Sequence, residues 1–137
     1  TTQEKQANTS STSQTLFNLK LLAYERIILF IERIKPDSFI PRTLSPSLPY
    51  QEYQLLLINE IRKEFEYNLS QQLYLSENAW EVTVNFKDNI ITLINSAATS
   101  CPPQATASDL ARKILEHYIS SDLKGDQILK IVKAEIQ

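Results

Sequence analysis

Residues 16–35, with the sequence LFNLKLLAYERIILFIERIK, contain no glycine or proline and are apolar over most of a helical surface. The next residue is Pro36, which lacks a backbone N–H and disfavours a helical conformation in the residue before it. The pattern predicts a helix that ends at this proline. Polar residues recur seven apart at Asn18, Glu25 and Glu32, so the predicted solvent-facing stripe is narrow. We therefore expect the helix either at the centre of a bundle or in contact with another copy of the chain.

The composition fits a single domain with its own core. A chain of 137 residues is long enough to fold without disulfides or metals. The chain has one glycine, Gly125, which is too few for glycine-rich phosphate-binding loops or tight hairpin turns. This scarcity of glycine favours helices. Its one cysteine, Cys101, excludes a disulfide within the chain. The net charge of −2, with both signs interspersed, gives no basic face for nucleic acid.

The segments on either side of the first predicted helix are dominated by breakers and polar residues. Residues 1–15 are rich in Ser, Thr, Gln and Asn, which predicts a flexible polar tether. Four prolines between residues 36 and 49 predict a long, stiff, extended loop. The second helix is expected over about residues 50–69, where apolar side chains repeat every four residues.

Residues 76–98 allow two interpretations. Trp80, Val82, Val84 and Phe86 alternate with polar residues as in a strand, and a turn after them would give a hairpin. A helical period of 3.6 residues also fits the whole segment, with Ser76 as a plausible N-cap. The pattern alone leaves the hairpin open as the alternative to a third helix.

Two more helices are predicted in the C-terminal part of the chain. Thr106 and Asp109 have the spacing of a capping box, which predicts a helix that continues to about residue 119. A last amphipathic helix is expected from Gly125 or Asp126 to the end of the chain. The fold class that follows is all-α: a single-domain bundle of about five helices over residues 16–137, with a long Pro-rich loop between helices 1 and 2.

Few residues in this chain could support catalysis or metal binding. His117 is the only histidine, no Glu-x-x-His motif occurs, and Cys101 with His117 supplies at most two of the usual four zinc ligands. We therefore predict no catalytic, metal-binding or cofactor-binding residues, and a protein that is not an enzyme.

The densest group of aromatic and amide side chains lies between helices two and three. Such side chains suit a groove for a peptide or a partner helix, and they equally suit a structural corner that needs hydrogen bonds. The candidate interaction surface comprises Tyr67, Asn68, Gln71, Gln72, Tyr74 and Trp80.

Several segments resemble an uncharacterised family of small bacterial proteins typical of the Bacteroidetes. They are LLAYERIILFIERIKP, LLLINEIRKEFEYNLSQQLYLSENAW, IITLINSAA and DLARKIL. The resemblance implies a helical domain that follows an N-terminal membrane anchor and a polar linker, on the cytoplasmic face of the bacterial inner membrane. It also favours the helical interpretation of residues 76–98, and it implies no activity, cofactor or site residue.

These patterns lead to a functional hypothesis without a chemical activity. We expect a membrane-tethered, cytoplasmic protein-interaction domain that recruits or organises an unidentified protein partner, with membrane contact only through an upstream anchor. The alternative is a module that binds a small molecule or lipid in a pocket between helices, lined by Tyr24, Phe30, Phe65 and Trp80.

Overall fold

The computed structural model describes residues 2–122 and 124–136, with side chains from Ser11 onward. Over these residues it contains six α-helices and one 3₁₀-helix and no strand, which confirms the predicted all-α class. The elements are α1 (Thr2–Ile34), α2 (Pro36–Thr43), α3 (Tyr50–Tyr67), η1 (Leu69–Tyr74), α4 (Glu77–Thr99), α5 (Ala107–Ser120) and α6 (Gly125–Ala134).

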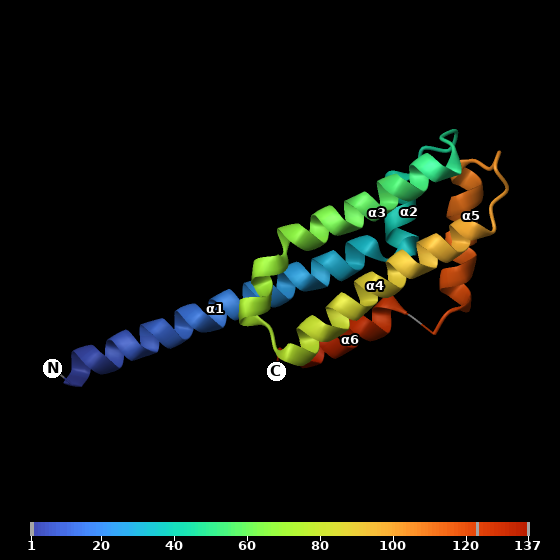
Figure 1. Ribbon diagram of the computed structural model, residues 1–137. Coiled ribbons are helices and arrows are strands. Elements are labelled where there is room, and N and C mark those ends of the chain that lie inside the picture. The colour runs from blue at the N-terminus through green and yellow to red at the C-terminus, as the bar shows by residue number, and fades with distance from the viewer. Residues whose placement is uncertain (1, 123, 137) are drawn as a thin grey trace.

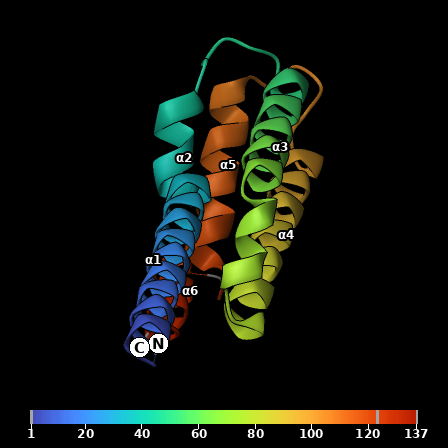
Figure 2. The same ribbon diagram turned by 90° about the vertical axis from the view of Figure 1, so that its left-hand side faces the viewer.

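The helices form an elongated bundle around one core. Figure 1 shows α1, α3, α4 and α6 along the long axis, with α2 and α5 across one end. Figure 2, along that axis, shows α5 between α2 on one side and α3 and α4 on the other. The largest fully buried side chains come from the long helices and from α2: Tyr24, Phe30, Phe39, Tyr53 and Phe86.

The segment after α1 differs from the extended loop that its prolines predict. Pro36 ends α1 as expected, but it also occupies the first turn of α2, where a missing N–H breaks no hydrogen bond. Pro41 lies inside this helix, and the helix forms in spite of it because Phe39 and Ile40 are buried in the core. The extended part of the connection is thereby reduced to residues 44–49.

The predicted count of five helices is also wrong because the connection between α3 and α4 is helical. Residues 69–74 form η1, a 3₁₀ turn that directly follows the end of α3. Together α2 and η1 raise the count to seven over the described residues.

The first helix begins at Thr2, so helical backbone continues through the segment predicted as a tether. This part of α1 projects beyond the bundle (Figure 1), and the side chains of residues 11–15 are exposed. Thr1, Leu123 and Gln137 lie outside the described residues. The division into a tether and a domain stays a prediction. In the described ranges, no helix is both long and apolar enough to cross a membrane.

Helices α4 and α5 begin at the caps that the sequence predicts. The side chain of Ser76 accepts a hydrogen bond from Ala79 N–H at 3.0 Å, and α4 then runs without interruption through the residues of the rival hairpin. The helical alternative is therefore confirmed. Thr106 and Asp109 form the predicted capping box at the start of α5.

Candidate functional site

A groove of about 370 Å³ lies between α1 and α3. Its apolar lining includes Leu29, which is 60% exposed, and Tyr67, which is 80% exposed. Charged side chains of both signs and one amide complete the wall: Arg26, Arg33, Glu60, Lys63, Glu64 and Asn68, with Phe30 as the third apolar residue. An open, apolar groove with a mixed charged rim is suited to binding an amphipathic helix.

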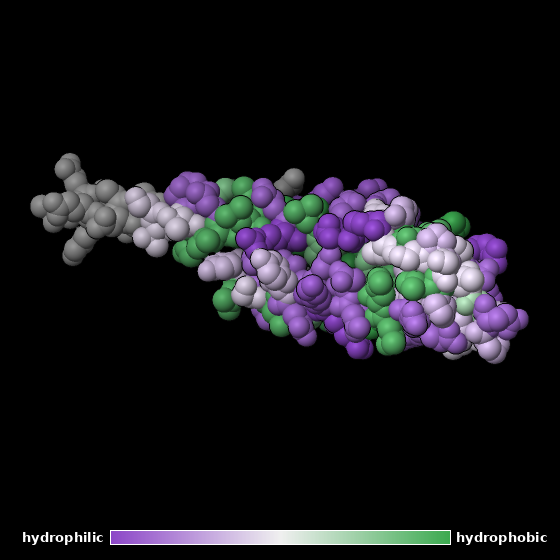
Figure 3. Space-filling view, turned by 90° about the horizontal axis from the view of Figure 1, so that it is seen from above, coloured by the Kyte–Doolittle hydropathy of each residue, from purple (hydrophilic) through white to green (hydrophobic). Residues whose placement is uncertain are grey.

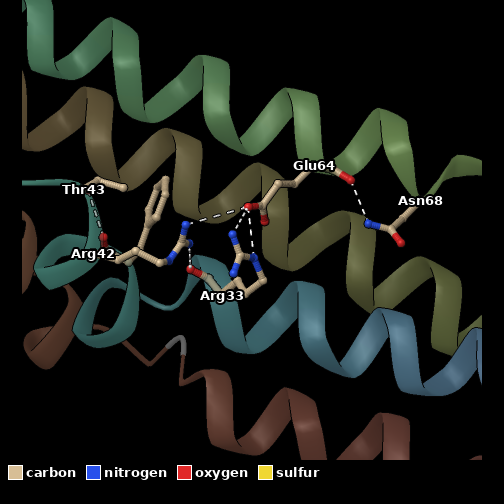
Figure 4. Close-up of polar contacts among 6 residues, drawn as sticks. Arg33, Arg42, Thr43, Glu64 and Asn68 are labelled. Atoms are coloured by element: carbon tan, nitrogen blue, oxygen red, sulfur yellow. Dashed lines mark hydrogen bonds and ion pairs between the residues drawn. The ribbon is translucent and has the colours of Figure 1, made fainter.

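A cluster of charged side chains fixes one end of this groove (Figure 4). Arg33 on α1 donates two hydrogen bonds to Oε1 of Glu64 on α3, at 3.0 and 2.8 Å. Arg42 on α2 donates to the backbone oxygen of Arg33 at 2.9 Å. The hydrogen bond and the charge of Glu64 raise the pKa of Arg33 above its ordinary value, so its guanidinium stays charged. The cluster joins three helices.

The structure separates the six residues of the predicted interaction surface. Tyr67 and Asn68 line the groove, where the Asn68 side chain also donates to the backbone oxygen of Glu64 at 2.8 Å. Tyr74 lines a different hollow, of about 300 Å³, beside Leu16 and Lys20. Of the other residues, Gln71 is half-buried, Gln72 is exposed and Trp80 is half-buried on α4.

Three of the four aromatic rings predicted to line a pocket pack on one another. Trp80 stacks on Phe65 with ring centroids 5.4 Å apart, and Phe65 meets Phe30 at 6.0 Å. Tyr24 is fully buried, and its hydroxyl accepts a hydrogen bond from the Ser76 backbone N–H at 3.1 Å. Of these four residues only Phe30 lines the groove described above.

Apolar side chains are exposed where α1 leaves the bundle, and all of them except Tyr67 were missing from the predicted interaction surface. Figure 3 shows apolar side chains gathered over this region. Leu73 on η1 is 77% exposed and shares the hollow of Tyr74 with Leu16, while Leu69, Phe17 and Tyr67 are also exposed. We call these five residues, Leu16, Phe17, Tyr67, Leu69 and Leu73, the apolar end. The sequence signal for Leu69 and Leu73 was their place beside Tyr67 in the polar-aromatic segment 64–76.

The lone histidine and cysteine lie apart from the groove. His117 is exposed on α5, in a shallow hollow with Glu116 and Ser96. Cys101 is buried after α4, and burial raises the pKa of its thiol. In the described part of the chain, no three His, Cys, Asp or Glu side chains come together as a metal site.

Comparison with curated proteins finds no match, and comparison with solved structures finds none either. One family model does match, and it covers residues 1–137. The chain therefore belongs to the group described as "Family of unknown function (DUF7935)".

Proposed function

We propose that this chain is a non-catalytic protein-interaction domain that binds another protein through its apolar end. The observation that carries the proposal is the exposure of Tyr67, the last residue of α3, and of Leu73 in the connection between α3 and α4. Clustered exposed apolar side chains are typical of binding surfaces, because a monomer gains nothing from leaving them in water. No residue of η1 is buried, so this connection contributes little to the core.

The chemistry of the apolar end favours a protein over a small ligand. Its side chains spread over two helices and a 3₁₀ turn, and Gln72 and Lys20 lie beside them. Apolar and aromatic residues at the centre with polar residues at the edge are typical of protein interfaces. An exposed apolar segment of another protein is the partner that fits.

We further propose that the domain works at the cytoplasmic face of the bacterial inner membrane, tethered by an upstream anchor. This part of the proposal rests on the family resemblance of the sequence. Fractionation of cells that produce the natural protein, followed by protease accessibility from each side of the membrane, tests the setting independently of partner binding.

Site-specific photo-crosslinking in the natural cell tests partner binding. A photo-reactive residue in place of Leu73 should give one discrete adduct with a different protein, identified by mass spectrometry. The matched control position is Leu55, which is 62% exposed on α3 and lies outside the apolar end. The identified partner, once purified, should bind the unmodified chain and lose affinity for Leu73→Ser but not for Leu55→Ser.

Absence of an adduct from position 73 would contradict the proposal, as would the same set of adducts from positions 73 and 55. Circular dichroism of each variant shows whether its helices are intact. Exposed substitutions away from caps and the core change the free energy of unfolding by less than about 0.5 kcal/mol, so both serine variants should fold.

A further inference from the structure

A stripe of exposed side chains runs along the outer face of α1 with the spacing of a coiled-coil seam. The stripe consists of Leu19, Leu22, Arg26, Leu29 and Arg33, which are separated alternately by three and four residues. Side chains at this spacing lie on one face of a helix and are suited to contact a second helix. Its two most exposed apolar residues are Leu22 and Leu29, at 52% and 60%, on either side of Arg26.

The stripe borders the groove between α1 and α3. Arg26, Leu29 and Arg33 belong both to the stripe and to the lining of the groove. A helix that lies along the stripe therefore contacts Tyr67 and Lys63 on α3 as well. The groove and the stripe form one surface, on which a single helix can be held between α1 and α3.

We propose that the occupant of this surface is α1 of a second copy of the chain, so that two copies pair around a two-fold axis. The occupant must be a helix with exposed apolar side chains at seam spacing. Among the described helices, α1 meets this requirement. Outside α1 and the apolar end, the large exposed apolar side chains occur one to a helix. They are Leu55 on α3, Ile119 on α5 and Ile131 on α6.

The charges on this surface are complementary to a copy of itself. Two cations on this surface, Arg26 and Lys63, have no ion-pair or hydrogen-bond partner within the described part of the chain. The same is true of two carboxylates, Glu25 and Glu60. A two-fold interface brings each surface against its own copy, so a surface with one sign of charge would repel its partner. A surface with both signs can pair each cation with a carboxylate of the other copy.

The same charges select the direction of pairing. In a parallel pair, Arg26 would lie opposite Arg26 of the other copy at the seam. In an antiparallel pair centred near Tyr24, Leu19 lies opposite Leu29, and Leu22 lies opposite Arg26. The antiparallel arrangement therefore keeps the two Arg26 side chains apart and places Leu19 of each copy against Leu29 of the other.

Sedimentation equilibrium of the full chain across a dilution series tests the pairing. The unmodified chain should reach twice the 15.7 kDa chain mass. Leu22→Glu with Leu29→Glu places carboxylates in the seam and should raise the dissociation constant of the pair by about thirtyfold or more. Leu55→Glu, at a similarly exposed site on α3, should leave the dissociation constant unchanged.

Three results would overturn the proposal: a monomeric unmodified chain, a pair that persists in the Leu22→Glu, Leu29→Glu variant, or equal weakening by Leu55→Glu. The pairing surface shares Tyr67 with the apolar end but does not include Leu73, so the tests of the two proposals fail separately. A monomeric chain that still gives the Leu73 adduct contradicts pairing alone, and a stable pair without that adduct contradicts partner binding alone.

Discussion

Of the two connections that flank α3, the first buries side chains in the core and the second leaves its side chains at the surface. The first, residues 35–49, contains four prolines, yet it forms α2 and buries Phe39 and Ile40. The second, residues 68–76, contains no proline, yet it buries no residue of η1. Their backbone hydrogen bonds differ in the same way. At the end of the first connection the Ala107 N–H donates to the Leu48 oxygen, and the Tyr50 N–H donates to the Ala105 oxygen. Most backbone hydrogen bonds of the second connection are local.

This contrast shows that burial, more than local backbone stiffness, decides which connection belongs to the core. Proline fixes one dihedral angle, but a buried aromatic ring stabilises a segment by several times more than that restriction contributes. The connection without buried side chains presents Leu73 to solvent, and Tyr67 at the end of α3 is exposed just before it. The first connection therefore contributes to the core, and the second carries part of the proposed binding surface.

The largest expected effect comes from removing a buried ring of the first connection. Phe39→Ala should lower the free energy of unfolding by about 3–5 kcal/mol, because the variant loses apolar burial and leaves a cavity. Urea unfolding followed by circular dichroism measures the change. The matched substitution in the second connection, Leu73→Ala, should alter it by less than about 0.5 kcal/mol. Similar losses in both variants would contradict the contrast between the connections.

The next effect concerns Lys35, at the junction between α1 and α2. Its side chain is ion-paired with Glu32 and Asp126, each at 3.1 Å, and it passes directly over Gly125 at the start of α6. Burial lowers the pKa of Lys35, but the hydrogen bonds to Asp126 and Glu32 outweigh burial and raise it overall. The junction is therefore held to α6 by a charged side chain and by close packing.

Gly125→Ala should destabilise the fold by about 1–3 kcal/mol, because a methyl group has no room there. The added Cβ would lie 2.3 Å from Cδ and 2.5 Å from Cγ of Lys35. In the Lys35→Ala background the same substitution should lower the free energy of unfolding much less. Urea unfolding of the unmodified chain, the two single variants and the double variant measures the coupling between the two sites. Additive effects would show that Lys35 is not the obstacle.

A smaller effect is expected at the capping box that meets the first connection. Thr106 pairs with Pro49 through a backbone bridge and caps α5, where its N–H donates to Asp109 at 2.9 Å. Thr106→Ala should lower the free energy of unfolding by about 1 kcal/mol, since a helix N–H loses its acceptor. Thr106→Ser keeps the hydroxyl and should recover most of the loss. An unchanged stability in Thr106→Ala would show that the bridge alone holds this segment.

The smallest effect is local and depends on pH. Glu135 accepts hydrogen bonds from Asn78 at 2.7 Å and from Ser76 at 2.9 Å, and so holds the end of the second connection to the C-terminal segment. These bonds, that of Asn78 first, lower the pKa of Glu135 below its ordinary value of 4.5. The carboxylate therefore stabilises the folded state above the ordinary pKa, and this contribution is lost as the pH falls through the lowered one.

Glu135→Gln tests this contribution, because the amide cannot ionise. At neutral pH the backbone amides of residues 76–80 should exchange with deuterium faster in the variant than in the natural chain. The difference should shrink as the pH falls below the ordinary carboxyl pKa. Hydrogen exchange measured over a pH series provides the comparison, and a difference that stays constant with pH would contradict the assignment.

Much of the fold could be predicted because it depends on local signals. The caps at Ser76 and Thr106 mark the helix starts, and Pro36 marks a helix end. Helix α2 was missed because its formation depends on the burial of Phe39, a tertiary contact that is not visible in the spacing of prolines.

The candidate site was less predictable for the same reason. Tyr67 and Asn68 were found because they stand out by type, but the groove also needs Leu29 and Arg33 from another helix. Trp80 was placed on the surface by its polar tip, whereas its stacking on Phe65 is a contact between α4 and α3. Sequence patterns identify which side chains are suited to a surface, and helix packing decides which of them remain there.

The position of Cys101 has a practical consequence for spectroscopic work. Its thiol is buried, donates to the Ala97 backbone oxygen at 3.7 Å and has a raised pKa, so its thiolate form is scarce at neutral pH. Maleimide reagents will therefore react much faster with a cysteine introduced on the surface than with the natural one. Fluorescent or spin labels can be attached at chosen sites without first replacing a core residue.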